Sequence, residues 1–489
     1  MSFFNRLIQK IVVAGIVTVF VLSAGIAHAQ NDISKPIDSL IKSHKLSDAK
    51  IGIEIAAINN PGIVYQKNQN LPLVPASNNK IITTAAALDM LGKDYCHTTT
   101  LFGKGKIDAA TKTFNGDIYV KGNGDPNISG RLYNNNSVKV FEDWAGALKS
   151  KGVTAINGNL VLDDTAFDYE FTNPSWQGEI MTEWYTAPVS ALSLNDNCID
   201  INISPDAKAG NPVRISTSPE TNYVTVKNNC TTSTDKNAKF GIARNDQGNV
   251  ITLSGQYYVK SGAATQFCTI YDPSMYFGYV LWETLAKNGI SINGKLLRGK
   301  SNFKKTDPGV TSFAELRAPL TATIAITNKK SQNFYAEQLL KTLGHEIKGA
   351  GSFNNGIAVV NAFLKKVGMA DNTVSVKDGS GLSKQNLQTA DSITRVLWYM
   401  YHSPNAKEFT SSLAQSGEDN TGLEKRLADK PGRIYAKTGR INGSCCLSGY
   451  ALGKSGEVYI FSILVNQFKS SESNVKDFHD DVCRLLTER

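Results

Sequence analysis

Three short motifs constrain this chain more than any other feature, because one fold must bring them together from distant positions. The first is Ser77-Asn78-Asn79-Lys80, the second is Ser331-Gln332-Asn333, and the third is Lys437-Thr438-Gly439, a tripeptide that occurs once in 489 residues. A Ser-x-x-Lys motif, a second serine motif and a Lys-Thr-Gly tripeptide in this order are typical of serine acyl-transfer enzymes. We therefore expect the three segments to meet around one reactive serine.

The Ser-x-x-Lys pattern alone is weak evidence, because Ser39 and Lys42, among other pairs, also fit it. Only Ser77 precedes a long apolar helical pattern, over residues 80–91. On a helix, Lys80 lies one turn from Ser77 on the same face, so its amine can reach the hydroxyl. A desolvated lysine beside a second cation, here Lys437, has a lowered pKa and can act as the base.

The second motif has two interpretations. Ser331 begins another helical pattern, and taken alone it fits an N-cap serine. Its position between the other motifs instead favours a second catalytic serine that relays a proton to the leaving amine. On the expected strand of the third motif, Lys437 and Thr438 can bind a carboxylate, and Gly439 lets the substrate backbone approach closely. The Gly-rich segment 378–383 is either a loop that lines the site or a simple turn.

The pattern along the chain predicts an α/β fold. Residues 51–58, 63–66, 433–438, 445–452 and 457–466 fit strands, which places both ends of the chain in one antiparallel sheet. Helical patterns cover residues 80–91, 332–343, 356–367, 392–401 and about 474–486. An antiparallel sheet flanked by helices satisfies both sets.

Between residues 97 and 308 the sequence changes to short strands, turns and polar loops. We interpret this part as a β-rich accessory region with two nested subdomains, inserted between the first and second motifs. The catalytic domain is then discontinuous and consists of residues 30–96 and 309–489.

Residues 1–29 resemble a secretory signal peptide: Arg6 and Lys10 precede an apolar run, and Ala27-His28-Ala29 fits a cleavage site after Ala29. A retained membrane anchor is the alternative. In an exported chain the seven cysteines allow disulfides, and one bridge is expected among Cys198, Cys230 and Cys268. The pairing stays open.

Composition argues against several other functions. The net charge is +9, but the basic residues are scattered, so no nucleic-acid partner is expected; contact with anionic envelope surfaces and an ordinary solvated surface both remain open. No His-Glu-x-x-His or Gly-x-Ser-x-Gly motif is present, and no metal or cofactor is expected. The segment 294–301 matches Gly-x4-Gly-Lys-Ser, but a poor helix pattern follows it, which disfavours a phosphate-binding loop.

At these motifs the chain resembles the penicillin-binding D-alanyl-D-alanine carboxypeptidases of the peptidase S13 type, the low-molecular-mass class C penicillin-binding proteins. The resemblance covers nearly the whole mature chain and includes Gly124-Asp125-Pro126 and Thr186-Ala187-Pro188 in the inserted region. It implies a transpeptidase domain like those of penicillin-binding proteins and serine β-lactamases. It also implies a periplasmic serine carboxypeptidase, with endopeptidase activity as a further possibility, whose partners are peptidoglycan stem peptides and acylating β-lactams.

The resemblance also implies roles for individual residues. Ser77 would attack the substrate carbonyl and Lys80 would accept its proton, while Ser331 and Lys437 would carry a proton to the leaving amine. Asn333 would hydrogen-bond the peptide, Lys437 and Thr438 would hold the terminal carboxylate, and the backbone N–H groups of Ser77 and Arg440 would bind the oxyanion.

Three positions depart from the usual family pattern. Arg440 follows the Lys-Thr-Gly tripeptide where a small hydroxyl residue is usual, and Lys384 stands where arginine is common. Ile180 precedes Met181-Thr182 where aspartate is common, with Glu179 one place earlier. The preferred third stem residue therefore stays open. A serine β-lactamase and a non-catalytic cell-wall binding protein are the alternative functions, and the oligomeric state is not predicted.

Overall fold

A six-stranded sheet joins the two ends of the chain. The computed structural model describes residues 33–370 and 372–489, so the expected signal peptide lies outside the described residues. The strand order is β16-β17-β18-β19-β1-β2, and β1 runs antiparallel to β19, with Lys50 opposite Asn466 and Ala57 opposite Tyr459. The strands are β1 (Lys50–Ala57), β2 (Gly62–Lys67), β16 (Ala414–Gln415), β17 (Ile434–Ile441), β18 (Ser444–Leu452) and β19 (Val458–Asn466). The antiparallel sheet expected from both chain ends is confirmed.

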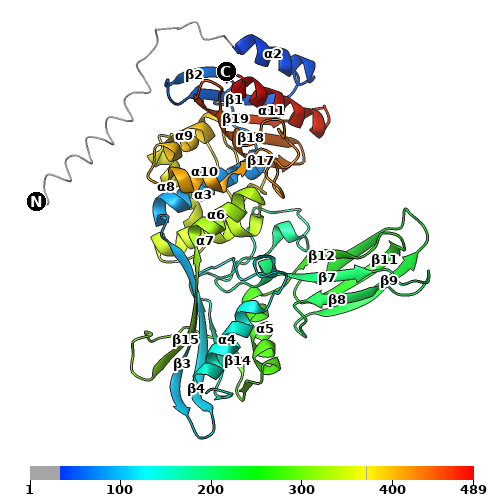
Figure 1. Ribbon diagram of the computed structural model, residues 1–489, viewed down its shortest axis with the longest axis vertical. Helices are drawn as coiled ribbons and strands as arrows, with labels where there is room; N and C mark the ends of the chain where they lie inside the picture. Colours follow the sequence, from blue (N-terminus) through cyan, green and yellow to red (C-terminus); the bar gives the residue numbers. More distant parts are fainter. Residues whose placement is uncertain (1–32, 371) are drawn as a thin grey trace, which may run out of the picture.

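Helices cover both faces of this sheet (Figure 1). On one face, α2 (Ser34–Ser43) and α11 (Glu472–Thr487) contribute Ile37 and Phe478 to a buried cluster that includes Phe461 of β19. On the other face lie α3 (Asn79–Leu91), α6 (Leu320–Lys329), α7 (Asn333–Lys348), α8 (Phe353–Lys366), α9 (Ala390–Tyr401) and α10 (Ala406–Ser412). Because both faces are covered, every residue of β19 is buried, and its sequence is a nearly continuous apolar run.

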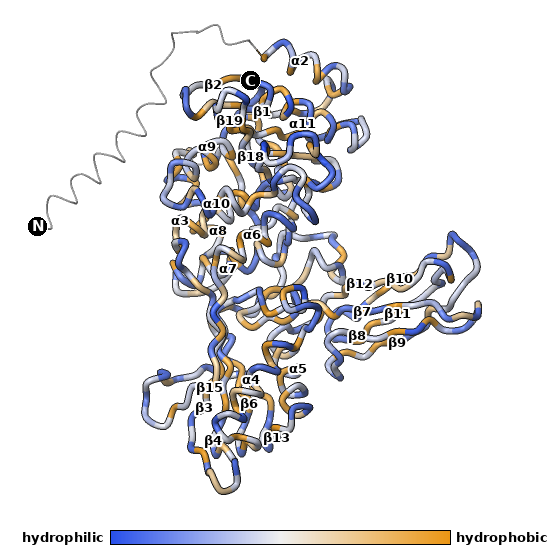
Figure 2. The backbone as a smooth tube through the Cα atoms, in the orientation of Figure 1, coloured by the Kyte–Doolittle hydropathy of each residue, from blue (hydrophilic) through white to orange (hydrophobic). Residues whose placement is uncertain are grey.

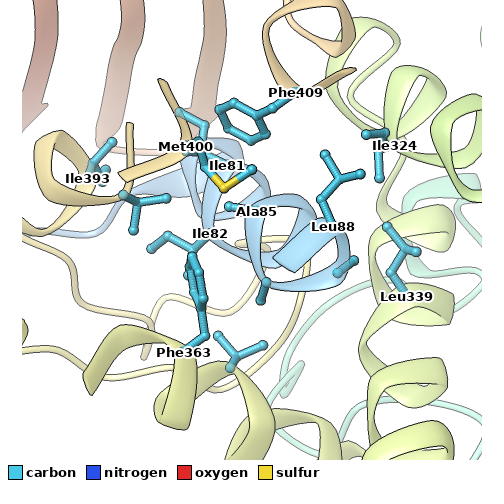
Figure 3. Close-up of a cluster of buried hydrophobic side chains, with 14 of the residues drawn as sticks. Ile81, Ile82, Ala85, Leu88, Ile324, Leu339, Phe363, Ile393, Met400 and Phe409 are labelled. Atoms are coloured by element: carbon cyan, nitrogen blue, oxygen red, sulfur yellow. The ribbon is translucent and has the colours of Figure 1, made fainter. Parts of the chain in front are cut away.

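Helix α3 lies at the centre of the helical layer. Its residues are buried from Asn79 to Leu88, and Figure 3 shows Ile81, Ile82, Ala85 and Leu88 surrounded by side chains of the neighbouring helices. These neighbours include Ile324, Leu339, Phe363, Ile393, Met400 and Phe409. A helix enclosed in this way is a rigid base for the residues at its N-terminal end, which include Lys80.

The inserted region begins with a long hairpin and forms a second sheet. Its main path is β13-β5-β4-β3-β15, and β6 pairs with β4 and β14. The helices α4 (Lys139–Ser150) and α5 (Pro273–Lys287) pack on it through Trp144 and Phe277. Its strands are β3 (Cys96–Asp108), β4 (Thr113–Gly122), β5 (Ala155–Asn157), β6 (Leu160–Asp163), β13 (Ser291–Ile292), β14 (Leu296–Arg298) and β15 (Val310–Pro319).

Two three-stranded sheets project to one side of the molecule, with hydrophilic tips (Figures 1 and 2). The first has the order β12-β7-β8 and the second β10-β11-β9. Their strands are β7 (Cys198–Ser204), β8 (Arg214–Ser218), β9 (Thr225–Ser233), β10 (Phe240–Arg244), β11 (Val250–Tyr258) and β12 (Ala264–Thr269).

The inserted region differs from its sequence description in two respects. It contains the two packed helices α4 and α5 in addition to strands, and β15 pairs with β3 along residues 310–319. The second sheet therefore includes residues after position 308. The segment 294–301 contains the short strand β14 (Leu296–Arg298) and is followed by turns instead of a helix, as expected.

The expectation of a disulfide bridge among Cys198, Cys230 and Cys268 is wrong. All seven cysteines lie in the described ranges and all are free. Cys198, Cys230 and Cys268 are buried among apolar side chains, where they act as small hydrophobic residues. Cys445 and Cys446 face opposite sides of β18, as alternation along a strand requires, and each packs into a different core cluster.

Across residues 33–370 and 372–489, none of the helices combines the length and the apolar character needed to cross a membrane.

Candidate active site

Ser77 lies in a tight turn that leads into α3. The short 3-10 helix Ala76–Asn78 precedes α3, and Ala76 has a φ of 48°, an uncommon conformation for a residue with a side chain. Asn78 Nδ2 donates to Ser448 Oγ at 2.7 Å, which fastens the turn to the central sheet. Ser77 itself is partly exposed.

Lys80 is fully buried beneath Ser77 and has three hydrogen-bond partners. Its Nζ lies 2.9 Å from Ser77 Oγ, 2.7 Å from Asn333 Oδ1 and 2.7 Å from the carbonyl oxygen of Ser380. Burial lowers the pKa of Lys80 to about 7, against the opposing effect of the nearby carboxylates of Asp378 and Glu337.

These three contacts orient the lysine amine once it is neutral. A neutral amine has two N–H groups and one lone pair, and the Asn333 and Ser380 oxygens can only accept hydrogen bonds. The two N–H groups therefore point to these oxygens, and the lone pair faces the Ser77 hydroxyl. This arrangement suits a base that takes the Ser77 proton.

Ser331 and Lys437 form a second pair beside the first. Lys437 Nζ donates to Ser331 Oγ at 2.9 Å and to the carbonyl oxygen of Thr438 at 2.8 Å. Burial and the positive charge of Lys80 hold the pKa of Lys437 well below its usual range. Ser331 is not a helix cap: Gln332 takes that position before α7, and Ser331 has a φ of 57°.

Asn333 links the site to the inserted region. It is the first residue of α7, its Oδ1 accepts from Lys80, and its Nδ2 donates to the carbonyl oxygen of Tyr185 at 2.9 Å. Tyr185 belongs to the 3-10 helix Trp184–Thr186 of the inserted region. The inserted region thus reaches the edge of the site.

The segment 378–383 lines the site instead of forming an isolated turn. Its Asp378 accepts from the backbone N–H groups of Gly381 and Ser383 at 2.7 and 2.6 Å. Gly381 has a φ of 83°, and a Cβ atom there would lie 1.9 Å from the carbonyl oxygen of Ala76. Only glycine fits this contact between the loop and the Ser77 turn.

The tripeptide Lys437-Thr438-Gly439 lies on β17 against the Ser77 turn. A Cβ atom at Gly439 would lie 2.7 Å from the carbonyl oxygen of Pro75 and 2.9 Å from Asn78 Oδ1. On the Cβ side of Gly439, the Ser77 turn thus occupies the space that the sequence pattern assigns to substrate backbone. Thr438 is partly exposed beside it.

A cleft of about 920 Å³ opens above these residues. Ser77, Ser331 and Asn333 line it, together with Gly381 and Leu382. Lys80 and Lys437 are buried and contact the serine hydroxyls from below. The cleft rim includes Glu179, Trp184, Tyr185, Lys384, Arg440 and Phe468.

Arg440 forms a salt bridge with Glu472 at the N-terminal end of α11, which draws its guanidinium to the rim.

Within the described residues, no group of three or more His, Cys, Asp or Glu side chains could hold a metal ion.

Known proteins share this architecture. A model of the D-Ala-D-Ala carboxypeptidase 3 (S13) family matches residues 33–489. The chain belongs to this family. The S13 resemblance and the expected fold class are therefore confirmed, and the protein is a hydrolase.

Individual S13 relatives match along most of their length. The chain is 28% identical to a D-alanyl-D-alanine carboxypeptidase of Actinomadura sp. over 89% of this chain and 81% of the relative. It is 25% identical to the D-alanyl-D-alanine carboxypeptidase DacB of Haemophilus influenzae over 88% of each chain. The crystal structure of penicillin binding protein 4 (dacB) from Haemophilus influenzae superposes with a TM-score of 0.79 at 22% identity, covering 93% of this chain and 99% of that one.

The fold brings together all the residues that the sequence motifs predicted for this S13 site. Ser77, Lys80 and Asn333 form one hydrogen-bonded group, and Ser331 and Lys437 form a second one beside the same cleft, with Thr438, Gly439 and Arg440 next to Lys437 on β17. Arg440 and Lys384, two of the positions that depart from the family pattern, lie on the cleft rim, as does Glu179, which precedes the third, Ile180.

Two contacts were missed by sequence reasoning. The carbonyl oxygens of Ser380 and Tyr185 bind Lys80 and Asn333, and a backbone carbonyl has no residue-type signal. The glycine pattern of segment 378–383 was the available clue to the first of them.

Gly381 offers a direct test of the packing between the loop and the Ser77 turn. Gly381→Ala should lower the penicillin acylation rate at least tenfold and destabilise the fold by roughly 1–3 kcal/mol, because the φ is positive and the new Cβ overlaps a carbonyl oxygen. Stopped-flow acylation and thermal unfolding measure the two effects.

The matched control is Gly349→Ala. Gly349 has nearly the same φ, 80°, but open space around its Cβ position. The Gly349→Ala variant should lose stability because alanine is strained at a positive φ, but its acylation rate should stay unchanged. Equal acylation rates for the two variants would contradict the packing argument.

Proposed function

We propose that this chain is a serine D-Ala-D-Ala carboxypeptidase that acts through an acyl-enzyme on Ser77. The observation that carries the proposal is the pair of 2.9 Å contacts, Lys80 Nζ to Ser77 Oγ and Lys437 Nζ to Ser331 Oγ, beside one cleft. Each serine hydroxyl has its own buried amine, so one pair can start acylation and the other can protonate the leaving group.

In the proposed acylation step, Ser77 Oγ attacks the carbonyl of the penultimate D-alanine while its proton passes to Lys80. The carbonyl oxygen becomes an oxyanion, and the backbone N–H groups of Ser77 and Arg440 stabilise it, each contributing about 3 kcal/mol. The C–N bond then breaks, and the terminal amine takes a proton from Ser331 Oγ. Lys437 in turn gives a proton to Ser331 Oγ. Lys80 then releases its proton to solvent and Lys437 takes one up, which restores the starting protonation states of both amines. Water attacks the ester carbonyl as its proton passes to Lys80, the C–O bond to Ser77 breaks, and Lys80 gives that proton to Ser77 Oγ.

In the same proposal, Lys437 and Thr438 hold the terminal carboxylate of the stem peptide. Lys437 is suited to this role because the Nζ already donates two hydrogen bonds near the cleft floor. Asn333 Nδ2 has two hydrogens, so one can stay on Tyr185 while the other binds the peptide. We also assign endopeptidase activity on cross-linked stems, since the cleft has a volume of about 920 Å³ and counts both Glu179 and Phe468 among its lining residues.

The test combines labelling with turnover. Purified protein is treated with fluorescent penicillin and digested for mass spectrometry, and it is then assayed for D-alanine release from a pentapeptide ending in D-Ala-D-Ala. We expect a stable adduct on the peptide that contains Ser77, with release of D-alanine. Cross-linked muropeptide dimers test the endopeptidase activity in parallel.

Other outcomes would favour the alternatives. Rapid hydrolysis of the antibiotic without a lasting adduct would favour a serine β-lactamase. Folded protein with neither adduct nor hydrolysis would favour a non-catalytic cell-wall binding protein. We further propose that the protein is exported and acts in the periplasm on peptidoglycan, in line with the signal-like residues 1–29, and that β-lactams acylate it as covalent inhibitors.

The pH dependence of acylation follows from Lys80. Burial lowers its pKa to about 7, so below pH 7 the amine is protonated and cannot accept the Ser77 proton. The second-order acylation rate should therefore fall about tenfold for each unit of pH below about 6 and level off above 8. A rate that is constant between pH 5 and 8 in folded protein would contradict this role.

A further inference from the structure

Glu337 is a buried carboxylate beneath the site with no role in the steps above. It lies on α7 one helical turn after Asn333 and is completely buried. Its Oε1 accepts from the backbone N–H of Ser380 at 2.7 Å, and its Oε2 accepts from the backbone N–H of Gly379 at 3.1 Å. The side chain thus accepts hydrogen bonds from two successive backbone N–H groups of the loop 378–383.

This contact needs a carboxylate in a place where a charge is costly. Burying an ionised carboxyl group is unfavourable unless hydrogen bonds compensate for the lost water, and two backbone N–H groups do so here. The same N–H groups would otherwise be buried without acceptors. A neutral side chain could satisfy only part of this requirement, because an amide has a single acceptor oxygen.

The loop 378–383, which Glu337 binds, is also the loop that binds the catalytic lysine. The Ser380 residue whose N–H binds Glu337 also presents its carbonyl oxygen to Lys80 Nζ at 2.7 Å. The other oxygen that orients Lys80 belongs to Asn333 on the same helix as Glu337. Both acceptors are therefore tied to one short stretch of α7.

We infer that Glu337 is a positioning residue for the proposed reaction: it holds the Ser380 carbonyl where it turns the lone pair of Lys80 toward Ser77. This inference rests on the proposed acyl-enzyme function. It adds a residue that touches no substrate and acts through the loop.

The charged groups around Glu337 predict a second measurable effect of its replacement, a change in the pKa of Lys80. Asp378 lies in the same loop 378–383. The charges of Lys80 and Lys341 interact with the Glu337 carboxylate, and the charge of Lys437 interacts with that of Lys80. Burial and the charge of Asp378 raise the pKa of Glu337, whereas the hydrogen bonds from the backbone N–H groups of Gly379 and Ser380 act in the opposite direction and favour the ionised carboxylate. The negative charges of Asp378 and Glu337 in turn raise the pKa of Lys80, against the stronger effect of burial. Removing the Glu337 charge should therefore lower the pKa of Lys80 further.

The experiment compares Glu337→Gln and Glu337→Asp with the wild type by the second-order rate of penicillin acylation between pH 5 and 9. Glu337→Gln should reduce the plateau rate at least tenfold, because its NH2 group faces a backbone N–H. Its acid limb should also move to lower pH, because the charge is lost. Glu337→Asp keeps the charge but is one methylene too short, so its plateau should fall while the acid limb stays near that of the wild type.

The matched control is Glu54→Gln. Glu54 on β1 is also a buried carboxylate of the same sheet-and-helix unit, with burial raising its pKa to about 7 and one oxygen, Oε2, without a hydrogen-bond partner. Its replacement measures the effect of removing a buried charge away from Lys80. We expect thermal stability to change and the acylation pH profile to match the wild type.

The outcomes separate the two proposals. Without acylation of the wild-type protein, the proposed function itself fails. If the wild type is acylated and folded Glu337→Gln keeps both its plateau rate and its acid limb, the positioning role is overturned. Should Glu337→Gln not fold, Glu337→Asp decides: a wild-type plateau rate in the folded aspartate variant would equally overturn the role.

Discussion

Replacing Ser77 by alanine should abolish penicillin labelling and D-alanine release altogether. In the proposed mechanism the Oγ atom of Ser77 forms the acyl bond, and alanine offers nothing in its place. Nucleophile and base act as a unit in such enzymes, where loss of one lowers turnover by roughly a millionfold. Ser77 is partly exposed at a turn, so thermal unfolding should change little and the loss would reflect chemistry alone.

Ser39→Ala is the matched control for this change. Ser39 and Lys42 have the same Ser-x-x-Lys spacing, but they lie on α2, and Ser39 is exposed. Its replacement should leave labelling and turnover intact. An adduct that persists in the Ser77→Ala variant and maps to another serine would refute Ser77 as the nucleophile.

Replacing Lys80 by methionine should lower the acylation rate by about a thousandfold or more. Methionine fills a similar volume but cannot accept the Ser77 proton, and a positioned general base typically contributes between 10² and 10⁴ in rate. The change also leaves the buried oxygens of Asn333 and Ser380 without a donor, which should cost about 1–3 kcal/mol of stability. Acylation kinetics and thermal unfolding together separate the two effects.

Two further variants sharpen this prediction. Lys80→Arg keeps a cation at the site but cannot act as a base near neutral pH, so it should be as slow as Lys80→Met. Lys341→Met removes another fully buried lysine, which binds Asp168 at 2.6 Å. It should lose stability while keeping most of its acylation rate. Substantial acylation by the arginine variant would contradict the base role of Lys80.

Local sequence patterns predicted much of this fold because local and global preferences agree. The apolar run of residues 457–466 corresponds to β19, which is buried on both faces, and the expected helix 80–91 differs from α3 by one residue. The three motifs gave Ser77, Lys80, Ser331 and Lys437 because their chemistry depends on residue types that are visible in the sequence.

The remaining features depend on contacts between distant segments. The need for glycine at Gly439 comes from the turn at Pro75, which no local pattern around residue 439 reveals. The helical pattern at Ser331 suggested a cap, whereas the chain turns through a left-handed conformation there before α7 begins at Asn333. Glu337 resembles any polar helix residue until the loop 378–383 is packed against it.

The pairing of β1 with β19 also determines when the protein can become active during synthesis. Ser77 and Lys80 are made early, yet the strand with Lys437 follows more than three hundred residues later, and β19 must then insert between β18 and β1. Contacts between such distant segments form slowly, because a long loop must close first. Ser77, the proposed nucleophile, therefore stays without its complete set of partners until almost the whole chain has emerged, and we expect activity to appear only as the sheet closes.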